Sequence, residues 1–596
     1  MAEIKNKPLA KQIKKQLIES QKQAINATSN AESHIDKHLF RRFHKLRNVK
    51  RFLSFWILTV GIIILGLFWQ IFAQFDYYQK LEPVPGGIYN EGLLGNFTNL
   101  NPIFANNEVD SSLSRLIFGS LITFDNNNKI SYELASSMKV NSTGTSYSLT
   151  LRPNLKWQDG KPLTAADVLF TFRLIQNPDV NSPLRSYFDG VSFSAKGNLI
   201  TFNIPNPLAS FPDYLNVGIL PQHILSTVPV SELRSSSFNT QNPIGSGPFE
   251  FKSLAVKGSD PSNAEVQINL APYKNYALGE PKLNAFIVHA YASVNQLEKA
   301  LLSGSLNGAD GISVPSSKID KNKRFKENSL ILTAGSYVFF RTSNSVLSNQ
   351  KVRSALEQAV NTKKIISSLG YKTTEVVSPF LKNQVEYNPQ YAQAQFNMDA
   401  ANTILTQDGW IMGSNGIRSK KGQELKFNLT IPNIKEYVNV ANLIKSDWAT
   451  IGAQADILAL DVQDFPSALN YHQYDAVLYG ISIGANPDVY AYWNSDMFNP
   501  ATSRWTNLSE YKNTEADTAL SAGRTRLDPV LRRVKYAPFL AAWQTDVPAV
   551  GLYQPRDLYI TNGTVFGLTT SNINSSADRY NNVNNWEIVE AKVTEK

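Results

Sequence analysis

Hydrophobic residues alternate with polar ones in short segments along the chain, and longer segments with an apolar helical face lie between them. The segment 146–151 (SYSLTL) has the period of two that predicts a half-buried strand. Asp159 and Gly160 then predict a turn, and Thr164 predicts the N-cap of a helix over residues 165–175. Strands that alternate with helices in this way predict an α/β protein with mostly parallel sheets.

The longest apolar run, residues 52–73 (FLSFWILTVGIIILGLFWQIFA), holds 22 residues and no charge. A helix of this length spans about 33 Å, enough for the hydrocarbon core of a bilayer. Six Lys and Arg residues closely precede the run, whereas the first charge after it is Asp76. The positive-inside rule therefore predicts a cytoplasmic basic tail (1–51), a single-pass transmembrane signal anchor (52–73), a linker (74–85) and an extracytoplasmic body.

Two alternatives stay open at this end of the chain. A cleaved signal peptide would also explain the apolar run, but its charged region would be unusually long and no A-x-A-like site follows. In the tail, Leu9, Ile13 and Leu17 recur every four residues among lysines. This spacing fits a basic amphipathic helix on an anionic membrane surface, and a solvated tail explains it at least as well.

Composition narrows the classes of partner. The net charge of +9 belongs to the tail, because residues 1–51 carry 13 Lys and Arg against 4 Asp and Glu. The rest of the chain holds 45 of each and lacks the net positive charge that attracts nucleic acid. Cysteine is absent, which excludes disulfides, thiolate metal sites and a lipid-acceptor cysteine. A chain of 596 residues is long enough for two or more lobes with cores of their own.

The string LRPNLKWQDGKPLTAADVLFTFRLI, residues 151–175, closely resembles the signature of the family 5 extracytoplasmic solute-binding proteins. These are the oligopeptide, dipeptide and nickel receptors of ABC importers. Further segments resemble the family in the same order, from about residue 86 to 566. They include the L-N-P turn at 100–102, NPIGSGPFEF at 242–251, MDAANTILTQDGW at 398–410 and N-P-D at 486–488. In NPIGSGPFEF, the two glycines predict a tight strand crossing.

The resemblance implies a two-lobed type II periplasmic-binding-protein fold with a third, inserted subdomain. Lobe I would comprise residues 86–338 and 549–596, with the inserted subdomain at about 127–242. Lobe II would comprise residues 339–548. Two chain crossings between the lobes would make a hinge that closes on a ligand in the cleft.

The resemblance also implies the function of the chain. It would be the membrane-anchored, monomeric substrate-binding subunit of an ABC importer and would capture oligopeptides or similar solutes. Its partners would be the ABC permease with its ATPase and, through residues 52–73, the membrane. The alternative is a cell-surface solute sensor or chaperone that uses the same fold.

The ligand contacts depart from the family pattern. Peptide-binding members pair the peptide amine with an Asp shortly before the D-P turn, but residues 483–485 (Ile-Gly-Ala) contain no acid. Asp488 becomes the candidate counter-charge, while a helix-capping or turn role for it stays equally open. Trp410 and Trp493 could be pocket walls or core residues. The candidate ligand-binding residues are Asn101, Phe118, Arg341, Trp410, Asn486, Asp488, Tyr490 and Trp493.

Catalysis and cofactor binding have little support in the sequence. Residues 480–484 (GISIG) match the nucleophile elbow G-x-S-x-G, but its hydrolase fold needs a His after the Ser, and the last His is His472. His223, His289 and His472 are far apart and lack the spacing of a zinc site. P-loop and dinucleotide-binding motifs do not occur. We therefore predict a protein that is not an enzyme and that uses no metal or cofactor.

Overall fold

The computed structural model describes residues 50–77, 79–258, 264–461, 464–499, 504–569 and 572–594, with Lys15, Ile18, Glu19 and Lys22 of the tail. The predicted amphipathic helix around Leu9, Ile13 and Leu17 lies outside the described residues. The chain forms two compact units, residues 1–82 with 590–596 and residues 83–589. The α-helices of the second unit are α4 (Glu108–Ile117), α5 (Ala165–Gln176), α6 (Gln222–Leu225), α7 (Val294–Ser303), α8 (Ser317–Asp320), α9 (Gln350–Ala359), α10 (Thr362–Ser368), α11 (Met398–Gln407), α12 (Lys435–Ala449), α13 (Phe465–Asn470), α14 (Tyr490–Trp493), α15 (Thr514–Arg524) and α16 (Pro529–Asp546).

An eight-stranded sheet collects strands from both ends of this unit. In sheet order its strands are β25 (Asn572–Ile573), β13 (Phe325–Leu332), β24 (Arg556–Asn562), β12 (Gly308–Asp310), β2 (Ile88–Leu94), β11 (Ala285–Tyr291), β10 (Glu265–Pro272) and β9 (Phe249–Lys257). β2 pairs in parallel with β11 and β12, whereas β24 and β10 run antiparallel to both of their neighbours. The prediction of mostly parallel sheets is therefore wrong, because β24 returns from the second sheet and enters between strands of the opposite direction.

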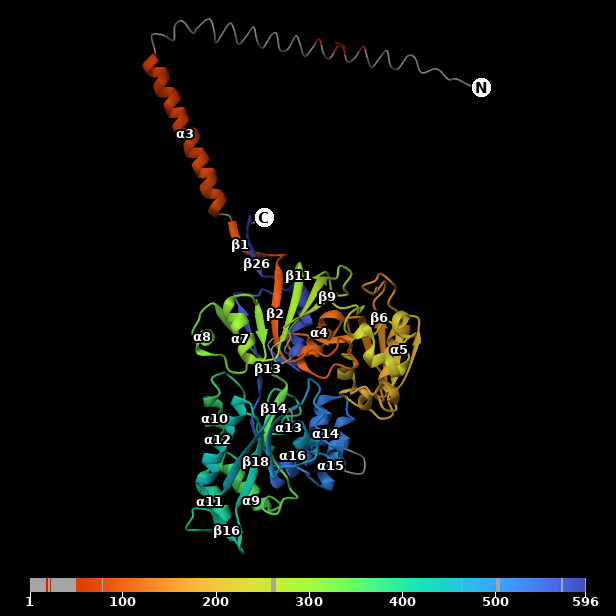
Figure 1. Ribbon diagram of the computed structural model, residues 1–596, viewed down its shortest axis with the longest axis vertical. Coiled ribbons are helices and arrows are strands. Elements are labelled where there is room, and N and C mark those ends of the chain that lie inside the picture. Colours follow the sequence, from red (N-terminus) through yellow and green to blue (C-terminus); the bar gives the residue numbers. More distant parts are fainter. Residues whose placement is uncertain are drawn as a thin grey trace, which may run out of the picture. The chain divides into compact units, whose positions relative to one another are not determined.

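A five-stranded sheet lies between two layers of helices. Its strands, in sheet order, are β19 (Gln454–Leu460), β18 (Lys426–Pro432), β20 (Ala476–Ser482), β14 (Ala334–Phe340) and β23 (Ala549–Tyr553). Figure 1 shows α9 to α12 on one side of it and α13 to α16 on the other. Along β14, Val338 and Phe340 enter one core while Tyr337 and Phe339 enter the other. The alternation buries both faces of the sheet, which explains its nearly continuous apolar strands.

Two chain crossings connect the two sheets. β13 continues into β14 through Thr333, and β23 continues into β24 through residues 554–555. The crossings touch, because the Leu332 backbone N donates to the Pro555 carbonyl at 3.0 Å. They lie a few residues outside the predicted lobe limits of 339 and 548. The assignment of whole lobes and of the inserted subdomain stays a prediction.

The first strand, turn and helix predicted from the sequence are confirmed. They belong to a four-stranded antiparallel sheet and its covering helix α5. β6 buries its alternate apolar residues, Gly160 adopts φ +85°, and Thr164 forms a capping box with Asp167 at the start of α5. The strands of this sheet are, in order, β5 (Ala135–Val140), β6 (Ser146–Leu151), β8 (Leu199–Asn203) and β7 (Ser192–Lys196).

A close approach is present at Gly245 and Gly247, but the segment crosses the end of a helix rather than the predicted strand. The segment before β9 passes against the C-terminal end of α4, and the Gly247 N–H donates to the Ile117 carbonyl at 2.8 Å. A Cβ atom at Gly245 would lie 1.9 Å from the Ile117 carbonyl oxygen, and one at Gly247 would lie 2.6 Å from its carbonyl carbon. The Ile117 backbone atoms cannot move aside as a flexible side chain could, so this contact requires glycine at both positions.

Gly245→Ala is therefore expected to lower the free energy of unfolding by about 2 kcal/mol, the usual cost of forcing atoms into a packed interior. Urea unfolding followed by circular dichroism measures the change. Gly480→Ala is the matched control, because the only close neighbour of its Cβ would be the Tyr437 hydroxyl, at 3.2 Å, and the next atoms lie at 3.9 Å. Equal losses in the two variants would contradict the argument.

A buried polar cluster fixes the C-terminal 3-10 helix η11 (Ser576–Asn585) beneath the eight-stranded sheet. Arg579 is fully buried and pairs with Glu91 of β2 at 3.1 Å and Asp310 of β12 at 2.8 Å. Burial alone would lower the pKa of Arg579, but the Asp310 and Glu91 carboxylates raise it, so the guanidinium stays charged. The cluster holds η11 in the position from which Asp578 reaches the cavity described below.

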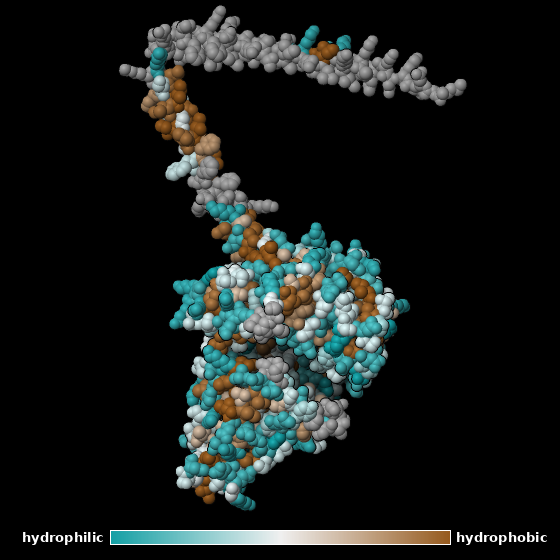
Figure 2. Space-filling view, in the orientation of Figure 1, coloured by the Kyte–Doolittle hydropathy of each residue, from teal (hydrophilic) through white to brown (hydrophobic). Residues whose placement is uncertain are grey.

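The N-terminal unit contains one long helix, α3 (Lys50–Tyr77). Its residues Phe52–Ile71 are long and apolar enough to cross a membrane. Figure 2 shows this helix as a nearly continuous hydrophobic surface, and side chains such as Leu65 and Trp69 are exposed. A helix that is apolar all round is typical of a membrane span.

The predicted linker, residues 74–85, has regular structure. α3 runs to Tyr77, and β1 (Gln79–Val84) forms a two-stranded sheet with the C-terminal strand β26 (Val589–Thr594). Pro83 is compatible with this strand because each strand of a two-stranded sheet has a free edge. The sequence did not indicate this pairing, since the partner strand lies about 500 residues away along the chain.

Candidate ligand-binding site

A cavity of about 330 Å³ opens where three parts of the second unit meet. One wall comes from the predicted inserted subdomain, the second from the turn after β20, and the third from the segment before η11. The residues that line it are Phe124, Tyr187, Ser210, Asp213, Tyr214, Asn216, Ser482, Ile483, Gly484, Asn486, Asp488, Ala491, Tyr492, Asn574, Ser575 and Asp578. A smaller cavity of about 200 Å³ adjoins it and shares Asn216, Ser575 and Asp578.

The turn after β20 is tied to the chain crossing between the sheets. The backbone N–H groups of Ile483 and Gly484 both donate to the Thr333 carbonyl, at 2.9 and 3.1 Å. Gly484 has φ +81°, a conformation that favours glycine. The Gln384 side chain donates to the Gly484 carbonyl at 2.9 Å. A change in the angle of this crossing would therefore move the turn that lines the cavity.

Hydrogen bonds also cross the cavity mouth. The Asn486 side chain donates to Asp213 Oδ1 at 2.6 Å, and its backbone N–H donates to Oδ2 at 3.1 Å. Ala209 N donates to the Arg524 carbonyl at 3.0 Å. These contacts join the predicted inserted subdomain to the predicted lobe II in the described arrangement.

Asp488 lies on the cavity wall but is already neutralised. Its Oδ2 pairs with Arg524 at 2.6 Å, and its Oδ1 accepts from the Tyr490 backbone N–H at 3.2 Å. The Arg524 guanidinium lies over the Tyr490 ring, 4.3 Å from its centroid. The turn role that the sequence left open is thus present, and a ligand cation would have to compete with Arg524.

Two further carboxylates on the wall were not anticipated from the sequence. Burial raises the pKa of Asp213 to about 6, although Asn486 hydrogen bonds and the positive charge of Arg532 oppose the shift. Burial also raises the pKa of Asp578, against the backbone N–H groups that it accepts. No local motif marks either residue, since each reaches the cavity only through the packing of separate segments.

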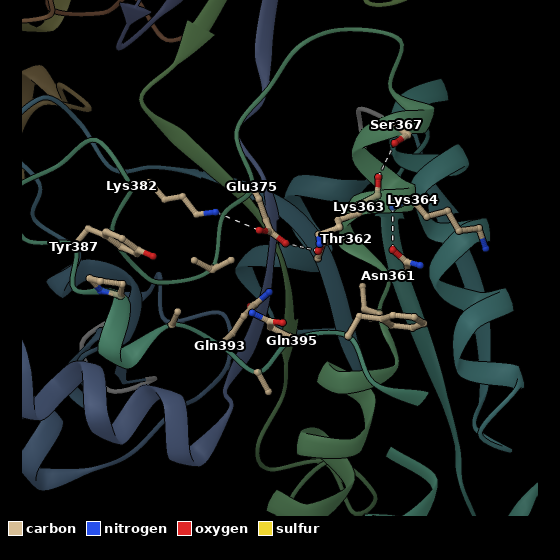
Figure 3. Close-up of a pocket in the computed structure, with 16 residues that line it drawn as sticks. Asn361, Thr362, Lys363, Lys364, Ser367, Glu375, Lys382, Tyr387, Gln393 and Gln395 are labelled. Carbon is tan, nitrogen blue, oxygen red and sulfur yellow. Dashed lines mark hydrogen bonds and ion pairs between the residues drawn. The ribbon is translucent and has the colours of Figure 1, made fainter. Parts of the chain in front are cut away.

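A larger cavity of about 640 Å³ lies within the part built on the five-stranded sheet (Figure 3). Residues 360–396 alone supply its lining. Figure 3 shows Lys382 and Thr362 converging on Glu375, and the Lys382–Glu375 ion pair measures 3.2 Å. Because a single segment encloses it and its one carboxylate is already paired with Lys382, we take the cavity between the three parts as the candidate site.

Comparison with known proteins identifies the family. A family model described as "Bacterial extracellular solute-binding proteins, family 5 Middle" matches residues 129–502. The chain is a family 5 solute-binding protein. Its α/β fold is the periplasmic-binding-protein fold expected from the sequence, preceded by one apolar helix that is a candidate membrane span.

Individual known proteins resemble the chain over most of its length. The oligopeptide-binding protein AppA of Bacillus subtilis is 25% identical over 491 residues, covering 80% of this chain and 88% of AppA. Protein XP55 of Streptomyces lividans is 27% identical over 471 residues, covering 76% and 81%.

Solved structures of family 5 proteins share the fold. AppA from Bacillus subtilis in complex with a nonapeptide gives a TM-score of 0.69 at 23% identity, covering 85% of this chain and all of AppA. NikZ from Campylobacter jejuni in complex with Ni(L-His) gives a TM-score of 0.70 at 21% identity, covering 84% and 99%. The ligands named for these two proteins differ in chemistry, so the shared fold leaves the ligand of this chain open.

The eight ligand-binding residues predicted from the sequence of this family 5 protein lie in different places in the structure. Asn486 and Asp488 line the cavity, Tyr490 lines a neighbouring cavity of about 450 Å³, and Phe118 lines the adjoining smaller one. Trp493 is fully buried in the core beneath the turn. Asn101, Arg341 and Trp410 do not line the candidate site.

Each of these last three residues has structural contacts elsewhere. The buried Asn101 amide donates to Asn239 at 3.0 Å. Trp410 packs in the core against α9 and α11. Arg341 follows the end of β14 that is distant from Thr333, about 20 Å along a strand of seven residues, and pairs with Asp475 at 3.5 Å.

Proposed function

We propose that this chain is the substrate-binding subunit of an ABC importer, that it captures oligopeptides, and that α3 anchors it in the membrane. The observation that carries the proposal is the polar cavity whose walls come from separate parts of a family 5 fold. Its turn is tied to one of two touching crossings, the arrangement that a hinge requires. The peptide class is taken from relatives named as oligopeptide-binding proteins.

In this proposal the parts on either side of the crossings close over a peptide and hold it by hydrogen bonds. The polar side chains of the cavity include three asparagines and three serines, which adapt to many peptide sequences through bridging water. The closed protein then docks on the permease, and the associated ATPase drives transport. No covalent step is involved, and the protein works as a receptor rather than as an enzyme.

The anchored topology is part of the same proposal. Residues 1–51 lie in the cytoplasm, α3 crosses the bilayer, and the body faces the exterior, as the positive charges before Phe52 favour. The full-length protein is expected to remain in bacterial membranes through high-salt and alkaline washes and to require detergent for extraction. Release of the intact protein without detergent would overturn the anchoring. N-terminal sequencing distinguishes this from cleavage of α3.

Peptide capture is tested on the detergent-extracted full-length protein. Mass spectrometry of the small molecules that co-purify is expected to find peptides. Titration with a mixed synthetic peptide pool is expected to show saturable binding. The absence of both, in protein whose circular dichroism shows a folded α/β chain, would reject peptide capture and favour the other solutes that the fold accommodates.

A further inference from the structure

The charge lining the candidate cavity has one sign. Its charged side chains are Asp213, Asp488 and Asp578, and among the described residues that line it none is Lys, Arg or His. The body of the protein is neutral overall, so this imbalance is local to the cavity. A cavity with walls of low dielectric concentrates such a field and repels anionic solutes.

Two of these carboxylates already have partners that satisfy them. Asp488 pairs with Arg524 at 2.6 Å, which cancels its charge. Asp578 accepts the backbone N–H groups of Asn574 and Ser575 at 2.9 and 3.1 Å and so caps the start of η11. Both residues therefore have structural roles that explain their presence without a ligand.

Asp213 differs from Asp488 because its hydrogen-bond partner is neutral, and from Asp578 because that partner lies on a separate segment across the cavity. Both of its carboxylate oxygens accept hydrogen bonds from Asn486, one from the side chain and one from the backbone. An ionised carboxylate offers about four acceptor positions, so Asp213 keeps capacity for a further donor and its whole negative charge. Asp213 is half-buried and has no ion pair among the described residues, and such a carboxylate is costly unless a ligand supplies a cation in contact with it.

Aromatic rings complete the wall beside this carboxylate. Tyr187 and Tyr214 stack with their centroids 4.5 Å apart, and Tyr492 lines the same cavity. Burial raises the pKa of Tyr214, and the Asp488 carboxylate raises it further, so the phenol stays neutral. Faces of neutral aromatic rings attract ammonium and guanidinium groups, which adds to the preference set by Asp213.

We propose that this cavity selects peptides with a net positive charge, and that Asp213 is the specificity residue that accepts the ligand's cationic group. The inference rests on the proposed capture of peptides and specifies their charge class. The cation would join Asp213 and Asn486 into one network across the cavity mouth, so that binding a cationic peptide also favours the closed arrangement.

The test uses full-length protein in detergent and three synthetic peptide pools matched in length. Their central residue is lysine, alanine or glutamate, and their other residues are randomised among neutral ones. At pH 7.5 the lysine pool is expected to bind at least about tenfold more tightly than the glutamate pool. Asp213→Asn, which keeps the shape of the side chain, is expected to reduce that ratio to less than about threefold.

Two controls separate selection by charge from a purely structural role. Asn486→Ala removes the side-chain hydrogen bond to Asp213 but keeps the backbone one and the Asp213 charge, so it should weaken all three pools together and keep their order. Asp179→Asn changes an exposed aspartate of the same subdomain and should change nothing. If Asp213→Asn behaves like Asn486→Ala, Asp213 is only a structural contact and the inference is overturned.

The outcomes also separate this inference from the proposed function. Equal binding of the three pools by the unmodified protein would overturn charge selection while peptide capture stood. Failure of all three pools to bind would overturn peptide capture and the inference with it.

Acidification gives an independent readout of the same group. With a pKa of about 6, Asp213 is mostly ionised at pH 7.5 and roughly nine-tenths protonated at pH 5. The lysine pool should therefore lose close to tenfold of its advantage between these pH values, since lysine itself stays charged. The charged and titratable groups that face Asp213 are Asp578 of η11, Arg532 of α16, the Asp488–Arg524 pair and Tyr214. An advantage that does not change with pH would overturn the assignment to Asp213.

Discussion

Replacing Arg579 with methionine is expected to lower the free energy of unfolding by about 3–5 kcal/mol. Arg579 and Glu91 are fully buried and Asp310 is nearly so, and the guanidinium neutralises both carboxylates. Asp557 lies beside this cluster, and burial together with the neighbouring Asp310 carboxylate raises its pKa. Methionine would fill much of the same volume but leave buried negative charge without a partner.

Urea unfolding of the detergent-extracted protein, followed by circular dichroism, measures this loss. Arg185→Met serves as the control, because Arg185 is exposed and its replacement should change stability by less than about 0.5 kcal/mol. Adding Glu91→Gln and Asp310→Asn to Arg579→Met should recover part of the loss, since it removes the uncompensated charges. A loss below about 1 kcal/mol for Arg579→Met alone would show that the cluster reorganises or admits water.

Trp493→Ala is expected to cost about 3–5 kcal/mol of unfolding free energy, as for other fully buried large aromatic residues. The Trp493 ring packs against Phe339 with centroids 5.5 Å apart and against Trp543 at 5.9 Å. Both neighbours belong to the core between the five-stranded sheet and α16. Trp493 ends α14, and Tyr490 at the start of this helix lines the cavity next to the candidate site. A void left by the missing Trp493 ring would therefore also loosen the wall of the site.

The substitution distinguishes a core residue from a ligand contact. A residue of the core loses stability with Trp493→Ala, whereas Trp493→Phe keeps most of the packing and should leave peptide affinity unchanged. A pocket-wall residue would show the reverse, with affinity lost in both variants and stability retained. Tyr471→Ala, at a largely exposed aromatic residue of the same region, is the control for circular dichroism measurements.

Local signals explain which parts of the fold could be predicted. The strand, turn and capped helix of residues 146–176 depend on neighbouring residues, and the sequence displays them directly. The paired glycines Gly245 and Gly247 indicate a close approach to another backbone segment, because few other features require glycine twice in three residues. The sheet order, the mixed strand directions and the pairing of β1 with β26 depend on segments far apart in sequence, for which periodicity carries no information.

Among the residues of the site, too, those marked by a local motif could be predicted and the others could not. Asn486 and Asp488 were predicted from a turn motif, and they line the cavity. Asp213 and Asp578 come from 3-10 segments without a motif, and only the packing of three separate parts brings them to the same cavity. Asp488 could be placed from the sequence, but its neutralisation by Arg524 could not, because 36 residues separate the two.

The pairing of β1 with β26 has a practical consequence for protein engineering. β1, which follows α3, and β26 form one two-stranded sheet, so the two ends of the folded chain lie next to each other. Chains with adjacent ends tolerate circular permutation. A permuted gene that encodes the body first and places α3 after β26 should keep the body folded with α3 attached, whereas a bulky tag fused directly to Thr594 would disturb the pairing of β26 with β1.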